Sequence, residues 1–147
     1  MPRIWDPGCE QQLIERLSPL TADTHPQWGK FTAARMLAHC ADAMKAGLGE
    51  KRLASKNTLL RIFPFNKLII YLAPWPKGAP TAPELLRNDD PDFEVEKAEC
   101  VRTLKRFAAA GPKYRFAEHA AFGSLSGNDW GALMYRHLDH HWRQFGL

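Results

Sequence analysis

The histidines of this chain gather near its C-terminus. Three of the six, His137, His140 and His141, stand in the segment 126–147. On a helix that turns about 100° per residue, His137 and His141 lie at roughly −20° and +20° from Trp130. They therefore share one face, one turn apart, within a stripe of otherwise apolar side chains. This spacing lets two imidazoles reach one ion, so the pair predicts half of a metal site.

The neighbours of this pair allow weaker predictions. His140 lies at roughly −80°, at the edge of the stripe. It is expected either to have no role in the site or to donate a hydrogen bond to a residue that binds the metal. Arg143 could orient an anionic group at the mouth of the site, although a solvated helix end is the commoner case. The motif HLDHH lacks the glutamate of HExxH metalloproteases, so no general base of that kind is implied. The competing interpretation is a histidine-rich helix end stabilised by the helix dipole, which explains exposed histidines but not two on the apolar stripe.

A second helical segment carries His39, which lies beside an apolar stripe and has Ala43 and Ala46 on its own side. The small neighbours leave room for the imidazole or for something bound to it, and position alone does not decide between the two. Asp42 could hydrogen-bond a His39 nitrogen, as carboxylates behind metal ligands do. His119, in a connector, could line a pocket mouth, although packing is the commoner role of such a residue.

The elements that position these residues are predicted to be all-α. Hydrophobic spacing and capping residues predict four amphipathic helices in one domain over residues 1–147. The first starts at Asp6, with Pro7 at its first position, and the third starts at Asp90, with Pro91 in the same role. The others are capped by Thr32 and by Ser126, which with Asp129 resembles a capping box. The expected starts and ends are Asp6 to near Leu20, Thr32 to Gly47, Asp90 to Gly111 and Ser126 to the C-terminus.

A long crossover, residues 50–88, separates the second and third of these helices. It is expected to hold one or two short helices on either side of Pro64, followed by a proline-rich loop over 74–83. Four amphipathic helices with one long crossover suggest a four-helix bundle.

The bulk composition sets limits on function. The net charge is +4, but Lys and Arg are scattered, so no specific nucleic-acid partner is expected. Three cysteines without close spacing argue against a disulfide framework and fit a reducing compartment. The N-terminus lacks the apolar core of a signal peptide, and the longest apolar run, near 68–73, is too short to span a bilayer. We therefore expect a cytoplasmic protein without a membrane partner.

Several motifs, taken in order, resemble a known superfamily. They are Trp28-Gly29-Lys30, Thr32, Met36-Leu37-Ala38-His39-Cys40, the HxxFG of residues 119–123 and the HLDHHxRQFG of residues 137–146. Nearly the whole chain is similar to the DinB/YfiT-like superfamily, and most of all to an uncharacterised bacterial branch with that terminal motif. The resemblance implies an up-down-down-up four-helix bundle, often a homodimer, with a divalent ion held by His39, His137 and His141. The apolar crossover departs from the family pattern and leaves the pocket mouth unpredicted.

Two functions are carried forward. The first is a metal-dependent transferase or hydrolase, with Zn or Ni as the favoured ion, acting on a small-molecule substrate. By resemblance to members of known activity, it would be a thiol-dependent S-transferase with a low-molecular-weight thiol as co-substrate. The alternative is a non-catalytic, stress-related bundle whose histidine cluster is structural or vestigial and which acts through a partner surface. The apolar segment 59–72 motivates the alternative.

Overall fold

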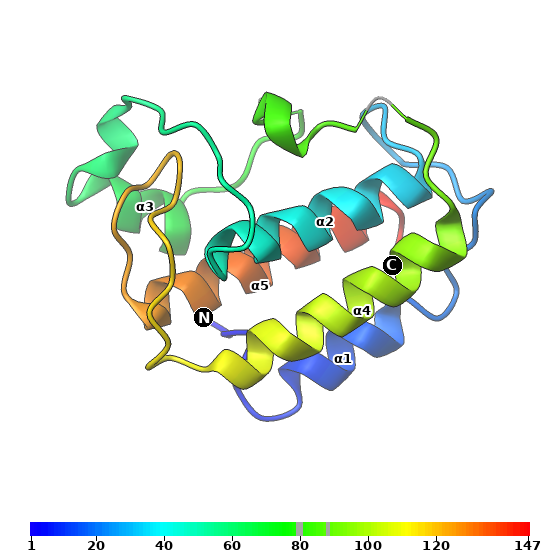
Figure 1. Ribbon diagram of the computed structural model, residues 1–147, viewed down its shortest axis with the longest axis horizontal. Helices are drawn as coiled ribbons and strands as arrows, with labels where there is room; N and C mark the ends of the chain where they lie inside the picture. Colours follow the sequence, from blue (N-terminus) through cyan, green and yellow to red (C-terminus); the bar gives the residue numbers. More distant parts are fainter. Residues whose placement is uncertain (79–80, 88) are drawn as a thin grey trace.

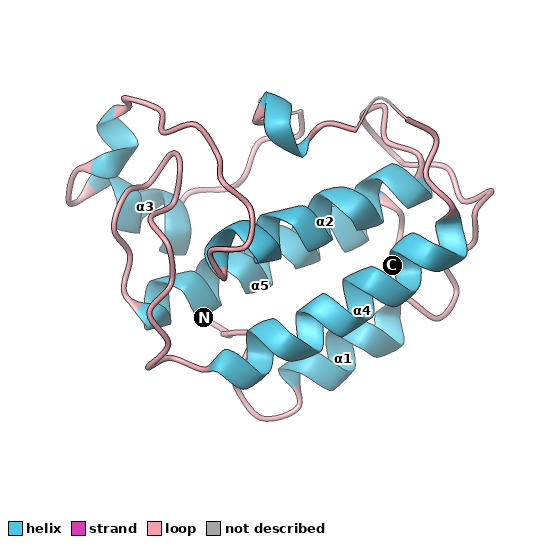
Figure 2. Cartoon of the chain, in the orientation of Figure 1, coloured by secondary structure: helices cyan, strands magenta, loops and turns pink. Residues whose placement is uncertain are grey.

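The chain is all-helical, as predicted. A computed structural model describes residues 1–78, 81–87 and 89–147, and these ranges contain five α-helices, two short 3-10 helices and no β-strand (Figure 2). The α-helices are α1 (Cys9–Arg16), α2 (Ala33–Gly47), α3 (Phe65–Tyr71), α4 (Phe93–Ala110) and α5 (Gly127–Gln144), and the 3-10 helices are η1 (Leu59–Arg61) and η2 (Pro83–Leu85). Residues 79 and 80 of the predicted proline-rich loop, and residue 88 of the crossover, lie outside the described ranges. Among the helices of the described residues, none is both long and apolar enough to cross a membrane.

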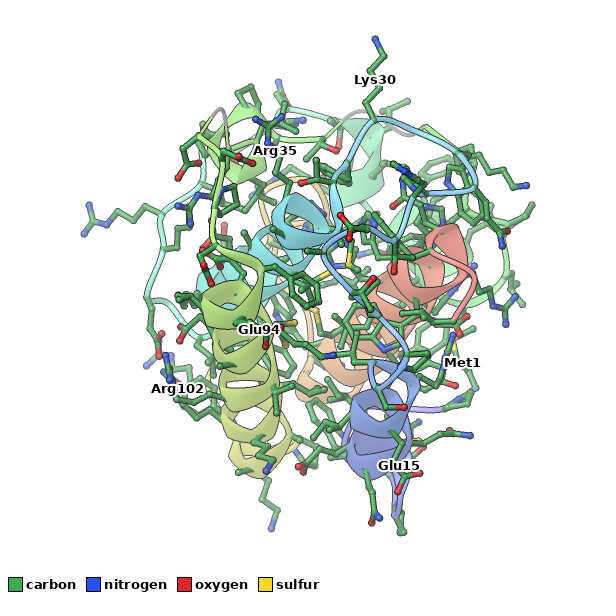
Figure 3. All side chains as sticks on the ribbon, turned by 90° about the vertical axis from the view of Figure 1, so that its right-hand side faces the viewer. Met1, Glu15, Lys30, Arg35, Glu94 and Arg102 are labelled. Carbon is green, nitrogen blue, oxygen red and sulfur yellow. The ribbon has the colours of Figure 1, made fainter. Side chains whose placement is uncertain are left out.

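Four helices pack against one another around a common core. Helix α2 contacts α4 and α5, and α1 contacts the same two helices. In Figure 1, α1 and α5 run from left to right, whereas α2 and α4 run from right to left. Seen along the helices in Figure 3, the four stand at the corners of a quadrilateral, and side chains fill the space between them. Helix α3 lies outside this group and contacts α5.

The core requires close approach between α2 and α5. Trp130 and Trp142 of α5 are among the largest fully buried side chains, together with Phe107 of α4. At the end of α2, a Cβ on Gly47 would lie 2.9 Å from a ring carbon of Trp130 and 3.0 Å from Phe107. Any side chain at position 47 would therefore displace one of these rings, which explains a glycine inside the last turn of α2.

Two of the four predicted helix caps are confirmed. The Thr32 hydroxyl accepts a hydrogen bond from the backbone N–H of Arg35 at 3.2 Å. Ser126 and Asp129 form a reciprocal capping box, in which each side chain accepts from the backbone N–H of the other residue. The two helices that carry the histidines of the predicted metal site thus start where their capping residues place them.

The other two predicted starts are wrong. Helix α1 begins at Cys9 after Gly8, because the Asp6 carboxylate accepts from the backbone N–H of Arg3 at 2.8 Å and does not cap a helix. This helix also ends at Arg16, short of the predicted end near residue 20. Helix α4 is capped by Asp92, whose carboxylate accepts from the N–H of Val95 at 2.9 Å. The predicted Asp90-Pro91 start lies just ahead of this second aspartate and is not part of the helix.

Polar contacts to α5 hold the crossover helix α3 in place. The buried carboxylate of Asp129 pairs with the ammonium group of Lys67 and accepts from the hydroxyl of Tyr71 at 3.0 Å. Arg136 donates to three carbonyl oxygens at the end of α3, at 2.7 to 2.9 Å. Those carbonyls belong to Ile69, Ile70 and Ala73. The crossover is therefore fixed to the helix that carries His137 and His141.

Candidate metal centre

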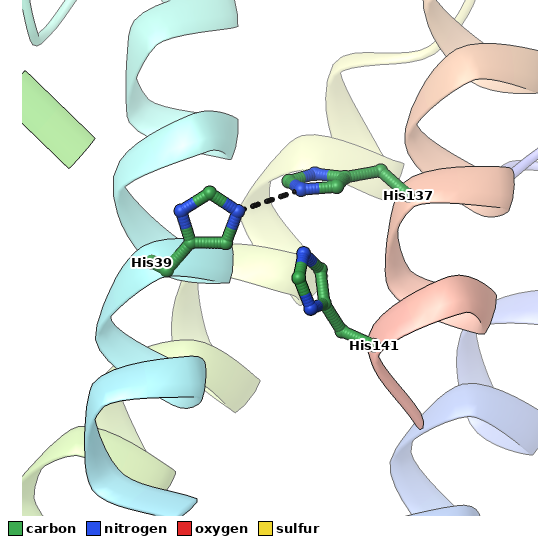
Figure 4. Close-up of side chains that lie close together, drawn as sticks. All are labelled: His39, His137 and His141. Carbon is green, nitrogen blue, oxygen red and sulfur yellow. Dashed lines mark hydrogen bonds between the residues drawn. The ribbon is translucent and has the colours of Figure 1, made fainter. Parts of the chain in front are cut away.

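Helices α2 and α5 bring three histidines together. His39 of α2 faces His137 and His141 of α5 (Figure 4). One ring nitrogen from each residue lies within 4.8 Å of the other two. His39 and His141 are buried, and His137 is half-buried. The structure thus assembles the three residues that are predicted as metal ligands.

Hydrogen bonds behind two of the rings fix which nitrogen faces the cluster. His141 Nδ1 lies 2.8 Å from Gln144 Oε1, and the amide nitrogen of Gln144 donates to the carbonyl of Trp28 at 2.9 Å. That second bond orients the amide, so Oε1 accepts and His141 Nδ1 carries the proton. His39 Nδ1 lies 3.4 Å from the carbonyl oxygen of Leu85, a long hydrogen bond in which only the ring can donate. Both rings therefore present an unprotonated Nε2, the atom that a metal ion requires.

The third ring bonds directly to the first. His137 Nε2 lies 2.9 Å from His39 Nε2. Because His39 donates through Nδ1, its Nε2 accepts and His137 Nε2 is the donor. A metal ion would replace this proton, and His137 would remain neutral by carrying its proton on Nδ1 instead. The donor set fits a divalent ion after this change of tautomer and a small separation of the two rings.

Burial keeps all three imidazoles neutral. It lowers the pKa of His39 to about 4, against the opposing effect of the Leu85 carbonyl. It lowers the pKa of His141 to about 3, with a further decrease from nearby His39 and an opposing increase from Gln144. Burial and the two neighbouring rings lower the pKa of His137 well below its ordinary value. Neutral imidazole is the form that binds metals, so the cluster is ready for an ion near pH 7.

A cavity of about 1140 Å³ opens onto the cluster, and all three histidines line it. Its walls are largely apolar and include Trp28, Phe31, Trp75, Trp130 and Leu133. This volume is slightly above the range typical of small-molecule sites, about 300–1,000 Å³. The arrangement can therefore hold a small molecule beside the three histidines.

The other predicted site residues lie at varying distances from the cluster. The carboxylate of Asp42 accepts from the Lys51 ammonium at 2.6 Å, while the His39 ring donates to Leu85. The predicted hydrogen bond between Asp42 and His39 is thus not formed. The Asp42 carboxylate pairs with Lys51 instead. His140 packs between Trp28 and Trp75, at ring distances of 5.7 and 6.1 Å, and lines the cavity without joining the group of three.

Two further predicted residues have contrasting positions. Arg143 is exposed, pairs with Asp139 at 3.0 Å and does not line the cavity. This agrees with the solvated helix end that the sequence favours for it. His119 does line the cavity, together with Phe122 and Trp130.

Sequence reasoning missed the partners of the histidines. Gln144 stands three residues after His141 on the same helix, a spacing that could have indicated the bond between them. The bond from His39 runs to a backbone carbonyl 46 residues away, and no side-chain pattern marks such a partner. The ring centroids of Trp75 and His137 lie 6.2 Å apart. Trp75 belongs to the proline-rich segment, for which the sequence predicts only a loop.

The fold and the site define an all-helical protein with a buried three-histidine cluster, suited to a divalent ion, between two helices. Residues 10–146 match the family described as "Protein of unknown function (DUF1569)". The chain belongs to this family. Comparisons with curated proteins and with solved structures gave no match.

Proposed function

We propose that the protein is a metal-dependent enzyme in which His39, His137 and His141 hold a divalent ion. The observation that carries the proposal is the convergence of their ring nitrogens within 4.8 Å at the wall of a large cavity. Three protein ligands leave coordination positions for water or substrate, as catalytic sites require. Neutral imidazoles suit Zn, Ni, Cu or Fe, and of these we favour Zn or Ni.

The fold in this proposal is the four-helix bundle of the DinB/YfiT-like superfamily. The directions of the helices support it, because α1 and α5 run opposite to α2 and α4 (Figure 1). This is an up-down-down-up order, with α3 inside the crossover between α2 and α4. The superfamily assignment itself rests on the motifs WGK, MLxHC and HLDHHxRQFG.

The proposed reaction is a thiol-dependent S-transfer to a small-molecule substrate. A bound divalent ion lowers the pKa of a coordinated thiol or water and so supplies a nucleophile near neutral pH. The role of the chain is to orient that ion, through the bonds that fix His39 and His141, and to hold the substrate against apolar walls. The thiol co-substrate rests on the family resemblance, whereas the ion and the pocket also rest on geometry.

The test is elemental analysis of the purified protein alongside His137→Ala and His141→Ala variants. We expect about one divalent ion per chain in the wild type and a loss of metal affinity of roughly a hundredfold or more in each variant. His25→Ala is the matched control, because His25 is exposed and away from the cluster. Retention of the metal by both cluster variants would exclude the proposed site.

A second candidate is a non-catalytic, stress-related protein that uses a partner surface. Two observations favour it. His39 and His137 hydrogen-bond each other, as expected of a structural cluster. Several large apolar side chains around η1 and α3 are exposed, namely Leu59, Ile62, Phe63, Phe65, Leu68 and Leu72. Exposed apolar patches of this kind mark interaction sites, including the interface of a homodimer.

Sedimentation separates the two candidates when it is combined with the metal analysis. A metal-free protein that forms a homodimer lost in a Phe63→Ser/Leu72→Ser variant would favour the second candidate. A metal-loaded protein whose oligomeric state does not change in that variant would favour the enzyme.

A further inference from the structure

The motif HAAFG, residues 119–123, builds a closed turn around one imidazole. The backbone groups of His119 and Gly123 bond each other in both directions at 2.8 Å. Gly123 has a φ of 72°, a left-handed conformation that favours glycine. The Arg61 guanidinium donates to the carbonyl of Ala120 at 3.1 Å and holds the turn from outside. The proposed metal site leaves this construction unexplained.

Inside the turn, one nitrogen of His119 is fully engaged. Its Nδ1 accepts from the backbone N–H of Ala121 at 3.1 Å and from that of Phe122 at 3.2 Å. An Nδ1 that accepts two hydrogen bonds carries no proton, so in the neutral ring the proton resides on Nε2. Burial lowers the pKa of His119 to about 4, which keeps the ring neutral at physiological pH. The turn therefore presents a fixed Nε2–H donor.

The Nε2–H of His119 has no acceptor among the described residues. The atom is nevertheless not among the buried unpartnered ones, so it remains accessible. His119 lines the same cavity as the three-histidine cluster. His119 therefore offers an accessible donor at the wall of the space in which a substrate of the proposed enzyme would lie.

The cavity walls hold other donors that lack protein acceptors. The indole N–H groups of Trp28 and Trp130 are buried and have no acceptor among the described residues. Both residues belong to the cavity wall. These two N–H atoms have almost no accessible surface, so a ligand in the cavity meets the Nε2–H of His119 and does not reach the two indoles. The rest of the wall is largely aromatic and aliphatic.

We propose that His119 is a ligand-binding residue whose Nε2–H donates a hydrogen bond to an acceptor oxygen of an otherwise apolar substrate. The chemical class is an aryl or alkyl compound with a carbonyl or similar oxygen, held between His119 and the three-histidine cluster. The inference rests on the proposed function for the identification of this ligand as substrate, but the donor and the cavity exist without it.

Two variants of His119 separate its roles. In His119→Asn, the side-chain oxygen takes the place of Nδ1 and accepts the two backbone bonds, but no donor reaches the cavity. In His119→Gln, the amide N–H₂ takes the place of the Nε2–H donor, but the turn loses its acceptor. We therefore expect His119→Asn to keep the turn and lose the ligand contact. We expect His119→Gln to keep the ligand contact in a folded protein whose turn is less stable.

The probes are a matched pair of neutral compounds, 2-acetylnaphthalene and 2-isopropenylnaphthalene, in which CH₂ replaces the carbonyl oxygen. Binding is followed by probe fluorescence in both metal-free and zinc-loaded protein. The wild type should prefer the ketone, and His119→Asn should weaken ketone binding about three- to tenfold. The hydrocarbon should bind this variant as it binds the wild type. His119→Gln should retain the preference for the ketone, and His25→Asn serves as a surface control.

Several results would overturn the inference. They are wild-type protein that binds neither probe, wild-type protein that binds both equally, and a His119→Asn variant that loses affinity for both probes alike. The last result would assign His119 a structural role only. Nitrogen-15 NMR gives an independent check, because a protonated Nδ1 in His119 would also contradict the inference. Failure of the metal site leaves the comparison in metal-free protein intact, so the two proposals fail separately.

Discussion

The two helices that carry the three-histidine cluster differ from the segments that cover its cavity. Helices α2 and α5 are regular and capped, and they bury apolar residues with helical spacing. The covering segments, residues 48–92 and 111–126, are mostly irregular in their described parts and reach the site by single contacts. Examples are the carbonyl of Leu85, the ring of Trp75 and the turn that holds His119.

The two regions therefore have different roles. One positions the three histidines, and the other influences which small molecules reach them. The helices fix where the three histidines stand, because packing of their apolar faces determines the position of every residue on them. Many residues of the covering segments line the cavity, so these segments influence which molecules enter it. The covering segments also expose large apolar side chains, whereas the helices bury theirs. Phe63 is 75% exposed, but Trp142 is fully buried. Substitutions in the two regions should therefore have different consequences.

The largest contrast is expected in stability. Trp142→Ala removes a fully buried ring of α5 and leaves the carbonyl of Leu13 without its 2.8 Å partner. It should lower the free energy of unfolding by about 3–5 kcal/mol. Phe63→Ser, in the covering segment, should change it by no more than about 0.5 kcal/mol. Urea unfolding of both variants measures the contrast, with Trp142→Phe to separate the ring from its hydrogen bond. Equal effects would show that the exposed segment is part of the core.

The second prediction concerns how the stability of the fold depends on pH. In metal-free protein the pKa of His119 is lowered to about 4 by burial, whereas the unfolded chain titrates near 6.5. Between these values the unfolded state binds the proton and the folded state does not, so stability falls as pH drops from about 6.5 to about 4. His119 alone contributes up to about 3 kcal/mol to this loss. His39 and His141 act in the same direction.

The measurement for this second prediction is urea unfolding at pH 7 and pH 4.5. His119→Asn should lose less stability than the wild type between these two values, because asparagine does not titrate. His25→Asn, at an exposed position, should follow the wild type. A His119→Asn variant with the wild-type pH dependence would place the titration elsewhere.

The comparison also shows what could be predicted from the sequence. The stripe of α5 and the i, i+4 spacing of His137 and His141 follow from helical periodicity, so these positions were predictable from the residues alone. His39 needed the family resemblance, because its place beside an apolar stripe fits either a ligand or a packed residue.

The rest depended on contacts that have no periodicity. The bond from His39 ends on a backbone carbonyl, which every residue carries, so no residue type indicates Leu85. Asp42 was predicted as the partner because of its short sequence distance, yet Lys51 binds its carboxylate. The predicted start of α4 was wrong because a second aspartate, Asp92, follows Asp90 closely and caps the helix. The predicted start of α1 was wrong because the Asp6 carboxylate bonds to the backbone N–H of Arg3.

The smallest expected effect concerns the hydrogen bonds that the Nδ1 atoms of His141 and His39 make. Gln144→Leu removes the 2.8 Å partner of His141 while keeping a side chain of similar size, and should weaken zinc binding about 10- to 100-fold. Leu85→Ala keeps the backbone carbonyl that accepts from His39, so it should weaken zinc binding by less than about threefold. Competition with a chromophoric chelator measures both affinities. A larger loss in Leu85→Ala than in Gln144→Leu would show that the covering segment, and not α5, determines the strength of metal binding.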